Sequence, residues 1–283
     1  TPKKSTFKIW SPDAKKVMLR LYDAGDSGAL VLTKKMKKGK NGVWSAKLKG
    51  DLEGKFYTFQ VQVGEKWLAE SPDPYAVAVG VNGKRAQVVD LKKTNPVRWE
   101  ADVRPPLKSH ADIILYEVHF RDLSMHPASS IKNKGKFLGL TELGTKTPGG
   151  KSTGLDHLKD LGITHVHMLP SYDFRSIDES KLSENKFNWG YDPENYNTPE
   201  GSFSTDPSDG RVRIREFKQV VKMLHDNGLR VIMDVVYNHT GATEESVFNR
   251  IAPGHYYRKN YDGTWSNASA CGNETASEKP KVR

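Results

Sequence analysis

Cysteine is nearly absent from this sequence of 283 residues, and Cys271, the single one, has no partner for a disulfide within the chain. Long apolar runs are also missing, because none approaches the roughly 20 residues that a membrane-spanning helix needs. The first residues, Thr1-Pro2-Lys3-Lys4, are not followed by the apolar stretch of a signal peptide. These absences argue against a disulfide scaffold and a membrane-spanning chain, but they leave the compartment undetermined.

Negative charge is in short supply, since 34 Asp and Glu face 44 Lys and Arg and give a formal net charge of +10. An excess of this kind favours a polyanion as a partner. However, Lys34-Lys35 and Lys37-Lys38 lie in a predicted hairpin loop between Gly28 and Gly39, without interleaved aromatic residues. We interpret these lysines as a solvated surface and expect neither a nucleic acid nor a membrane as a partner.

Apolar residues make up only 36% of the chain, and in residues 1–105 they occur in short runs that often alternate with polar residues. Turn residues such as Asn41-Gly42 and Asn82-Gly83 separate these runs. Short strands at regular spacing are typical of a β-sandwich, so we predict a β-sandwich domain over residues 1–105. The predicted strands lie at 7–10, 17–22, 43–48, 56–63 and 86–90.

After a polar, proline-containing linker, the pattern changes to buried strands that alternate with amphipathic helices. In the clearest helix, Phe217, Val220, Val221 and Leu224 recur on one face, and Asn227-Gly228 ends it. The order strand, helix, strand is typical of a parallel sheet. The predicted strands lie at 113–118, 163–169 and 231–236, and the predicted helices begin near residues 153 and 211.

A closed (β/α)8 barrel requires eight strands in roughly 250 residues, whereas only about 175 residues follow the linker. We therefore predict that residues 106–283 form the first part of a (β/α)8 TIM-type barrel, about three βα units, and that this barrel is incomplete. We expect the rest of the barrel to lie on a separate chain or to be missing. Because an open barrel leaves a hydrophobic sheet edge, we expect residues 1–283 alone to be unstable and prone to aggregate.

The most informative stretch is 230–240, where a buried strand ends in a polar tip that carries Asn238 and His239. Asp234 lies within the apolar run, and burying a carboxylate is costly unless it has a partner. Polar side chains at the carboxyl ends of parallel strands are typical of an active site. The alternative is a structural Asp held by backbone or arginine partners, beside a histidine without a function.

The segment 187–193 is dense in aromatic residues and contains a glycine that permits close backbone approach. Aromatic faces such as that of Tyr191 stack on the apolar faces of sugar rings, and Asp192 is suited to accept hydrogen bonds from hydroxyl groups. The alternative is a loop that merely packs the mouth of the barrel. Glu117, at the end of the first parallel strand, is by position either catalytic or an orienting group.

His165 and His167 share one face of a predicted strand, which is the geometry of a metal pair. Against a metal site, the pair lies mid-strand and a zinc site requires three or four ligands. We assign no metal here, although a metal-dependent barrel hydrolase stays open as a minor alternative.

Taken together, five segments resemble type I pullulanases, the starch-debranching members of the α-amylase superfamily. The segment around Asn188-Trp189-Gly190-Tyr191-Asp192-Pro193 is the most specific of them, although Phe187 stands where the family usually has Tyr. Residues 1–105 resemble the β-sandwich that precedes the barrel in debranching and branching enzymes and is often classed as a glycan-binding module. The five segments are 116–122, 161–170, 188–193, 234–240 and 271–278.

The resemblance implies retaining hydrolysis of α-1,6-glucosidic bonds in pullulan, amylopectin and glycogen-derived dextrins by two carboxyl groups about 5 Å apart. In the family these groups lie on later barrel strands, so we expect no catalytic residue in this chain. The resemblance implies that Tyr191 stacks on a sugar ring, that Asp192 bonds hydroxyl groups or holds the loop, and that His239 bonds the hydroxymethyl side. The supporting residues would be Asp234, Asn238, Trp189 and Asn188.

The resemblance further implies two partners, a branched α-glucan and the carboxy-terminal remainder of the same enzyme. No cofactor is required, and a calcium ion, which some relatives bind, is left unplaced. The alternatives are a non-catalytic starch- or glycogen-binding protein and, with less support, a relative of isoamylase or branching enzyme.

Overall fold

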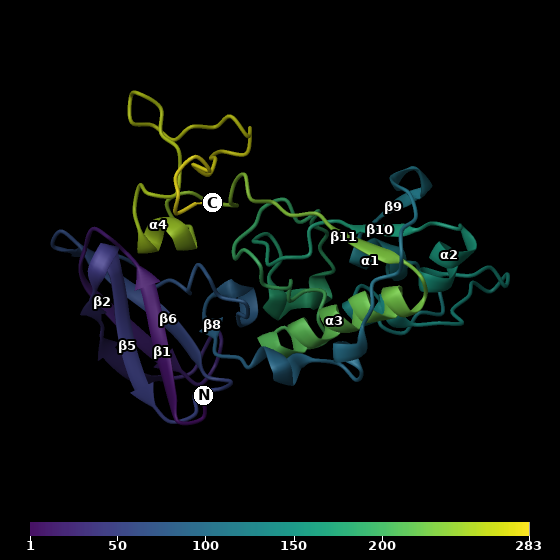
Figure 1. Ribbon diagram of the computed structural model, residues 1–283, viewed down its shortest axis with the longest axis horizontal. Coiled ribbons are helices and arrows are strands. Elements are labelled where there is room, and N and C mark those ends of the chain that lie inside the picture. The colour runs from purple at the N-terminus through teal and green to yellow at the C-terminus, as the bar shows by residue number, and fades with distance from the viewer. Residues whose placement is uncertain (283) are drawn as a thin grey trace.

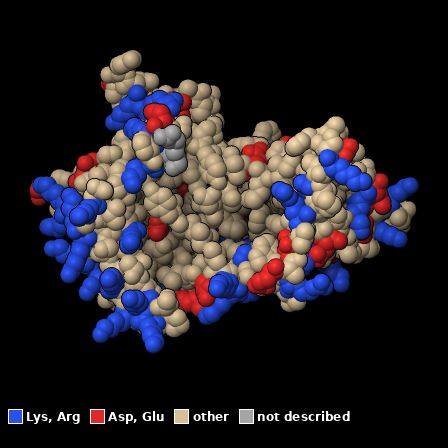
Figure 2. Space-filling model, in the orientation of Figure 1, with Lys and Arg blue, Asp and Glu red and all other residues tan. Residues whose placement is uncertain are grey.

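The computed structural model describes residues 1–282 as a β-rich half and an α/β half that lie side by side along the long axis (Figure 1). No helix within these residues is long and apolar enough to cross a membrane. Lysine and arginine side chains crowd the outer side of the β-rich half, whereas both signs of charge mix over the α/β half (Figure 2).

Two antiparallel sheets pack against each other in the β-rich half. One has the strand order β1-β5-β4 and the other β3-β2-β6-β7, with β8 paired to β6. Alternation along the strands places Val17, Leu19, Phe59 and Val61 in the shared core, where all four are fully buried. The strands are β1 (Lys4–Trp10), β2 (Ala14–Tyr22), β3 (Leu30–Lys35), β4 (Lys37–Lys38), β5 (Val43–Lys49), β6 (Phe56–Val63), β7 (Lys66–Trp67) and β8 (Ala86–Gln87).

Three parallel strands form the sheet of the α/β half, in the order β11-β10-β9. These are the three strands predicted from the sequence, and together with the sandwich they confirm the expected fold class. Helices α2 and α3 contribute Leu155, Leu158, Val220 and Leu224 to the core against this sheet. The elements are β9 (Leu115–Val118), α1 (Phe120–Met125), α2 (Gly154–Asp160), β10 (His165–Met168), α3 (Gly210–Asp226), β11 (Arg230–Met233) and α4 (Val247–Ile251).

The parallel strands are shorter than predicted at their ends. The last ladder bond of β11 is donated by the Asp234 amide to Met168, and the chain then turns away, so 234–236 is not strand. Of these three parallel strands, only β10 is paired on both sides within residues 1–282, which leaves one free edge each on β9 and β11. The barrel is therefore open in the described part of the chain.

Residues after 240 return to the β-rich half. Helix α4 places Ile251 in the core of the sandwich, and the Ser11 hydroxyl donates to the Ile251 carbonyl at 2.6 Å. The hydroxyl groups of Tyr75 and Tyr256 also meet at 2.8 Å. These contacts join the two halves, so the division at residue 105 stays a prediction from the sequence.

Candidate functional site

The carboxyl ends of the three parallel strands bring together one side chain from each. His167 of β10 lies opposite Glu117 of β9, and its ring nitrogens are 3.7 Å from a Glu117 oxygen and 4.0 Å from an Asp234 oxygen. His165 lies two residues earlier on the same strand and is buried. Its Nδ1 atom is hydrogen-bonded to the Thr164 hydroxyl. The two histidines therefore have different surroundings, and His167 belongs with the strand-tip carboxylates.

Tyr191 connects the aromatic loop to these strand tips. Its hydroxyl donates to Asp234 Oδ2 at 2.7 Å, while its ring remains 39% exposed. Burial, and next the hydrogen bond to Asp234, raise the pKa of Tyr191 to about 12. The hydroxyl therefore keeps its proton at neutral pH and fixes both the tyrosine and the carboxylate.

His239 lies beneath the same loop and is almost fully buried. Its Nε2 atom is 2.7 Å from the Tyr191 carbonyl, so the proton on Nε2 is donated to the backbone. Its Nδ1 atom is buried and has no hydrogen-bond partner within the described residues. The structure thus places the His239 ring against the backbone of Tyr191, while a bond from His239 to a sugar stays a prediction.

Asn188 and Asp192 hold the loop in shape. The Asn188 side chain accepts from the Gly190 amide at 2.8 Å and donates to Asp192 Oδ1 at 2.8 Å. The Ser176 hydroxyl donates to the other Asp192 oxygen. Both Asp192 oxygens are therefore engaged within the protein, which favours the loop-holding role of the two that the resemblance implies.

Gly190 is required at its position in this loop. Its φ of +92° is left-handed, and a Cβ atom there would lie 2.7 Å from the Pro170 carbonyl. The tight turn leaves the neighbouring Trp189 side chain 65% exposed beside Tyr191. Trp189 and Tyr191 therefore both offer aromatic surface to solvent from this loop.

Asn238 does not join this group. Its side chain is exposed and lines a separate cavity of about 440 Å³ with residues such as Arg258 and Glu274. Its backbone carbonyl accepts from the Thr275 amide at 2.9 Å. The structure therefore brings together Tyr191, Asp234 and His239 but leaves Asn238 outside.

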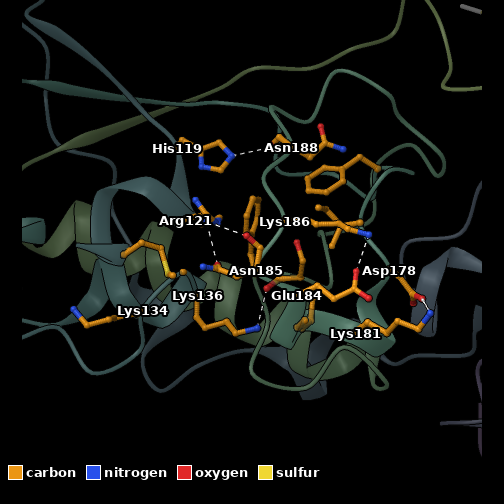
Figure 3. Close-up of a pocket in the computed structure, with 17 residues that line it drawn as sticks. His119, Arg121, Lys134, Lys136, Asp178, Lys181, Glu184, Asn185, Lys186 and Asn188 are labelled. Carbon is orange, nitrogen blue, oxygen red and sulfur yellow. Dashed lines mark hydrogen bonds and ion pairs between the residues drawn. The ribbon is translucent and has the colours of Figure 1, made fainter. Parts of the chain in front are cut away.

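A cavity of about 200 Å³ lies behind the aromatic loop and was not anticipated from the sequence (Figure 3). His119 lines it together with Asn188 of the loop, and the His119 Nε2 atom is 2.9 Å from the Asn188 carbonyl. Burial lowers the pKa of Lys136, whose ammonium donates to the Ser202 carbonyl at 2.8 Å. Five cations line the cavity, Arg121, Lys134, Lys136, Lys181 and Lys186, and each already bonds to a protein oxygen.

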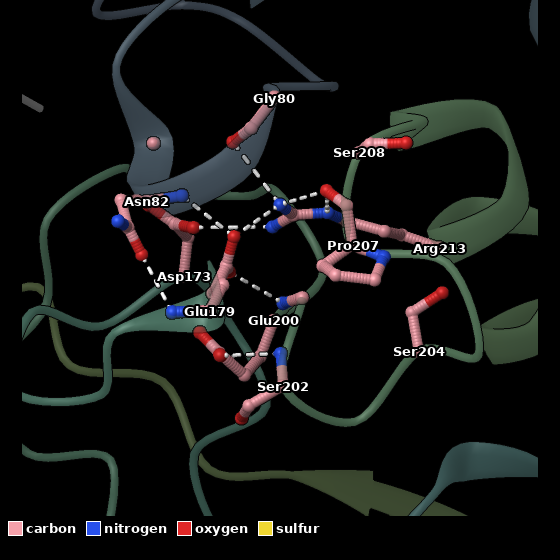
Figure 4. Close-up of polar contacts among 12 residues, drawn as sticks. Gly80, Asn82, Asp173, Glu179, Glu200, Ser202, Ser204, Pro207, Ser208 and Arg213 are labelled. Atoms are coloured by element: carbon pink, nitrogen blue, oxygen red, sulfur yellow. Dashed lines mark hydrogen bonds and ion pairs between the residues drawn. The ribbon is translucent and has the colours of Figure 1, made fainter. Parts of the chain in front are cut away.

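A buried ionic cluster, defined by Asp173, Glu179, Glu200 and Arg213, lies where the two halves meet (Figure 4). The Arg213 guanidinium of α3 donates to Glu179 at 2.6 Å, to Asp173 at 3.3 Å and to the Gly80 carbonyl at 3.0 Å. Glu200 instead accepts from the backbone amides of residues 174 and 202, at 3.0 and 2.7 Å. The α3 helix is thereby tied to the loop after residue 79.

Within residues 1–282, only the three carboxyl groups of this cluster have the spacing of a metal site, with ligand oxygens within 4.8 Å of one another. However, the guanidinium already provides a cation to two of them. Burial, and next the charge of Glu179, raise the pKa of Asp173 to about 8 and that of Glu200 well above its ordinary value. The cluster therefore holds protons at neutral pH, and we place no metal in it.

The sequence contained a signal for this cluster that the interpretation missed. Arg213 lies four residues before Phe217 and so shares the buried face of the predicted helix, where a charged residue is unusual. Its partners lie in the long polar segment 171–210, in which nothing marks a buried acid.

Comparisons with known proteins agree with this architecture. The family model of carbohydrate-binding module 48 (isoamylase N-terminal domain) matches residues 1–76, and that of the alpha-amylase catalytic domain matches residues 146–278. The pullulanase of Bacillus subtilis is 39% identical over 279 residues, which are 99% of this chain and 38% of that protein. The chloroplastic pullulanase 1 of Arabidopsis thaliana is 32% identical over 98% of this chain and 32% of its own length.

Solved structures give the same result. The pullulanase of Paenibacillus barengoltzii, in complex with maltohexaose and alpha-cyclodextrin, matches with a TM-score of 0.97 at 50% identity. The match covers 100% of this chain and 44% of that chain. The pullulanase of Bacillus acidopullulyticus matches with a TM-score of 0.95 at 43% identity, over 100% of this chain and 34% of its own. The chain thus spans less than half the length of these relatives.

The fold and the two family models define a carbohydrate-binding module 48 domain followed by part of an alpha-amylase catalytic domain. Over its whole length the chain corresponds in sequence and structure to the amino-terminal portion of a pullulanase-type enzyme. This confirms the resemblance to pullulanases that the motifs indicated.

Proposed function

We propose that the chain is part of a debranching glycoside hydrolase that cleaves α-1,6-glucosidic bonds in pullulan, amylopectin and glycogen-derived dextrins. The observation that carries this proposal is the match to pullulanases over the whole chain, with a TM-score of 0.97 at 50% identity. Cleavage would proceed with retention of configuration through two carboxyl groups about 5 Å apart. The nucleophile and the acid/base are expected outside residues 1–283.

In this proposal the described residues provide the sugar-binding side of the site. Tyr191 offers its exposed ring to one face of a glucosyl unit, and Asp234 keeps that ring in place through the 2.7 Å hydrogen bond. His239 holds the backbone of the same loop through its hydrogen bond to the Tyr191 carbonyl. Asp192 stabilises the loop by accepting a hydrogen bond from the Asn188 side chain. A site built this way is rigid before the sugar arrives, which lowers the entropic cost of binding.

Binding and hydrolysis are tested separately on the purified chain. We expect maltotriose to shift the resonances of Tyr191 and Trp189 in an NMR titration, while pullulan incubated with the same sample releases no maltotriose. Hydrolysis by the purified chain would contradict the proposed location of the catalytic carboxyl groups. Absence of any maltotriose-dependent shift would contradict the sugar-binding role.

We also propose that the reaction requires no cofactor, while a calcium ion, which some relatives bind, stays unplaced. At the cluster around Arg213, whose carboxyl groups have the spacing of a metal site, a guanidinium takes the position that a cation would occupy. The test is maltotriose binding and thermal stability before and after exhaustive chelation, both of which we expect to stay unchanged.

A second candidate function is glucan binding through the β-rich half alone. The match of residues 1–76 to carbohydrate-binding module 48 favours it. Under this alternative, the full-length chain would bind glycogen with equal affinity when Tyr191 is replaced by Ala. Loss of binding in Tyr191→Ala instead favours the strand-tip site.

A further inference from the structure

The net positive charge of the chain is confined to its first 49 residues. These contain 13 Lys and Arg against three Asp, whereas residues 50–283 contain 31 of each sign. The excess of +10 therefore belongs to strands β1 to β5 of the sandwich and to no other part of the molecule. Twelve of the 13 cations are lysines, and Arg20, the single arginine, is paired with Glu70.

The register of the β1-β5-β4 sheet collects five of these lysines on its outer side. Phe7 and Ile9 of β1 and Trp44 and Ala46 of β5 point into the core, so the residues between them point outward. Lys4 lies directly opposite Lys49, and the pairing of β4 with β5 places a further lysine on the same side. We call this surface the basic face; it consists of Lys4, Lys8, Lys37, Lys47 and Lys49, all exposed.

The basic face is not neutralised by the protein itself. Within the described residues, none of its five ammonium groups forms an ion pair with a carboxylate. Like charges directly opposite on neighbouring strands, as at Lys4 and Lys49, destabilise a sheet. Because this uncompensated positive charge costs stability, we interpret the basic face as a binding surface for a negatively charged partner.

An exposed apolar segment lies on the same stretch of chain as one strand of this surface. The edge strand β3 of the other sheet is joined to β4 through Met36 alone, and its Leu30, Val31 and Leu32 side chains are 45%, 53% and 38% exposed. Lys34 and Lys35 follow them on the same strand. Lysine next to exposed apolar side chains is the combination by which peripheral proteins bind an anionic bilayer, since each element alone binds weakly.

Other polyanions fit these residues less well. Sequence readout of nucleic acid relies on arginine forks, and single strands stack on exposed aromatic rings. The outward residues of β1 and β5 include no arginine, and their one aromatic ring, Trp10, is packed against His255 and Tyr256. Neutral glucans also bind by stacking on exposed aromatic rings, so the basic face is distinct from the sugar site proposed at Tyr191.

We propose that the basic face, together with the apolar segment Leu30–Leu32, is a docking surface for an anionic lipid bilayer. This departs from the expectation of no membrane partner, which rested on the absence of a spanning helix and on reading the lysines as a loop. The lysines are instead arrayed on a sheet. The chain would lie on the bilayer surface without crossing it.

Vesicle flotation tests the proposal, because vesicles rise in a density gradient whereas aggregated protein sinks. We expect the chain to float with phosphatidylcholine vesicles that contain about one third phosphatidylserine, and not with pure phosphatidylcholine vesicles. Binding should disappear as salt rises from about 50 mM to about 500 mM. Equal flotation with both vesicle types would overturn the proposal.

Charge-reversal variants locate the surface. We expect Lys47→Glu combined with Lys49→Glu to lower the partition onto anionic vesicles more than about tenfold, since each lysine near such a surface contributes measurably. The matched control, Lys146→Glu with Lys151→Glu, makes the same change of charge on exposed loop residues of the α/β half and should change partition less than about twofold.

The same variants separate function from folding. A glutamate at 49 faces Lys4 across the strands, so the double variant should unfold at an equal or higher temperature while its vesicle binding falls. Val31→Ser with Leu32→Ser should also weaken flotation without a change of net charge. Partition of the Lys47/Lys49 variant equal to that of the unmodified chain would refute the proposal, as would complete displacement from vesicles by a short DNA duplex at equal phosphate concentration.

Discussion

At the scale of single residues, the Tyr191–Asp234 hydrogen bond explains most of what the strand-tip site does. It joins a loop residue to a carboxylate 43 positions later and keeps a phenol ring exposed at a fixed angle. The ring and the hydroxyl have separate tasks, because the ring faces solvent while the hydroxyl faces Asp234. Substitutions that remove one without the other therefore give different results.

Tyr191→Phe keeps the ring and removes the hydrogen bond, whereas Tyr191→Ala removes both. We expect Phe to weaken maltotriose binding by about fivefold, since a hydrogen bond of this kind contributes about 1 kcal/mol. Ala should weaken it by much more, because the stacking surface is lost. NMR titration or calorimetry measures both affinities, and equal losses in the two variants would contradict a stacking role.

Gly190→Ala tests the close approach of the loop to Pro170. The left-handed φ alone costs an alanine about 1 kcal/mol, and here the new Cβ atom would also meet the Pro170 carbonyl at 2.7 Å. The matched control is Gly228→Ala, where φ is +79° and no atom lies within 4 Å of the added carbon. Urea denaturation should show a clearly larger loss of stability at 190; equal losses would mean that the loop relaxes freely.

At the scale of elements, we expect the free edge of β9 to promote self-association of the chain in solution. The Leu115 and Tyr116 side chains are 47% and 38% exposed, and the backbone on that side has no partner strand within the described residues. An unpaired apolar edge of this kind associates with other edges.

Leu115→Lys places a charge on this edge and should raise the concentration at which the chain begins to associate, by severalfold. Val97→Lys is the control, because Val97 is 86% exposed but lies outside any strand. Light scattering against concentration measures the effect. If both variants behave alike, net charge and not the strand edge governs association.

The strands and helices with a clear period were predictable from the sequence, because burial on one face imposes the pattern that was read. Helix α3 was placed to within one residue of its start for this reason, and the three parallel strands were found at their places in the chain. The hydrogen bond between Tyr191 and Asp234 was not predicted, since 43 residues separate them and no local pattern records a contact at that range; the family resemblance only assigned both residues to one subsite.

Two further features escaped prediction for physical reasons. The basic face depends on strand register: lysines at 4 and 49 become neighbours only when β1 pairs with β5. For His167 the sequence suggested only a metal pair with His165, to which we assigned no metal, because alternation along one strand says nothing about Glu117 and Asp234, which arrive from the flanking strands. Both features depend on contacts between neighbouring strands, which the pattern within a single strand does not record.

At the scale of the whole molecule, the buried ionic cluster makes the union of the two halves depend on pH. Arg213 shares its single positive charge between Glu179 and Asp173, so the three carboxyl groups together remain short of positive charge. Lys136 lies close enough to feel Glu200 and Glu179, while Glu194 adds further negative charge near Asp173. Ionising every carboxyl group would leave buried charge without a partner, which is costly.

The direction of the effect follows from proton binding. The pKa of Asp173 is raised to about 8 in the folded chain, whereas an unfolded Asp titrates near 3.9. Between these values the folded state binds more protons than the unfolded state. Stability is therefore greatest at the acidic end of this window and is lost as pH rises toward 8, by about 1.4 kcal/mol per pH unit for each proton.

Asp173→Asn removes this titration while keeping the shape of the protonated acid, so the decline of stability between pH 5 and pH 8 should become shallower by about one proton. Glu65→Gln, at an exposed carboxylate on the sandwich, should leave the slope unchanged. Urea midpoints across this range measure all three proteins. Because Asn82 and Gly80 of the β-rich half bond directly to the cluster, the protection of loop 80–83 against hydrogen exchange, relative to the base-catalysed intrinsic rate at each pH, should fall with pH in the unmodified chain and stay flat in Asp173→Asn. Parallel slopes for the unmodified chain and Asp173→Asn would show that other groups control the pH dependence of this interface.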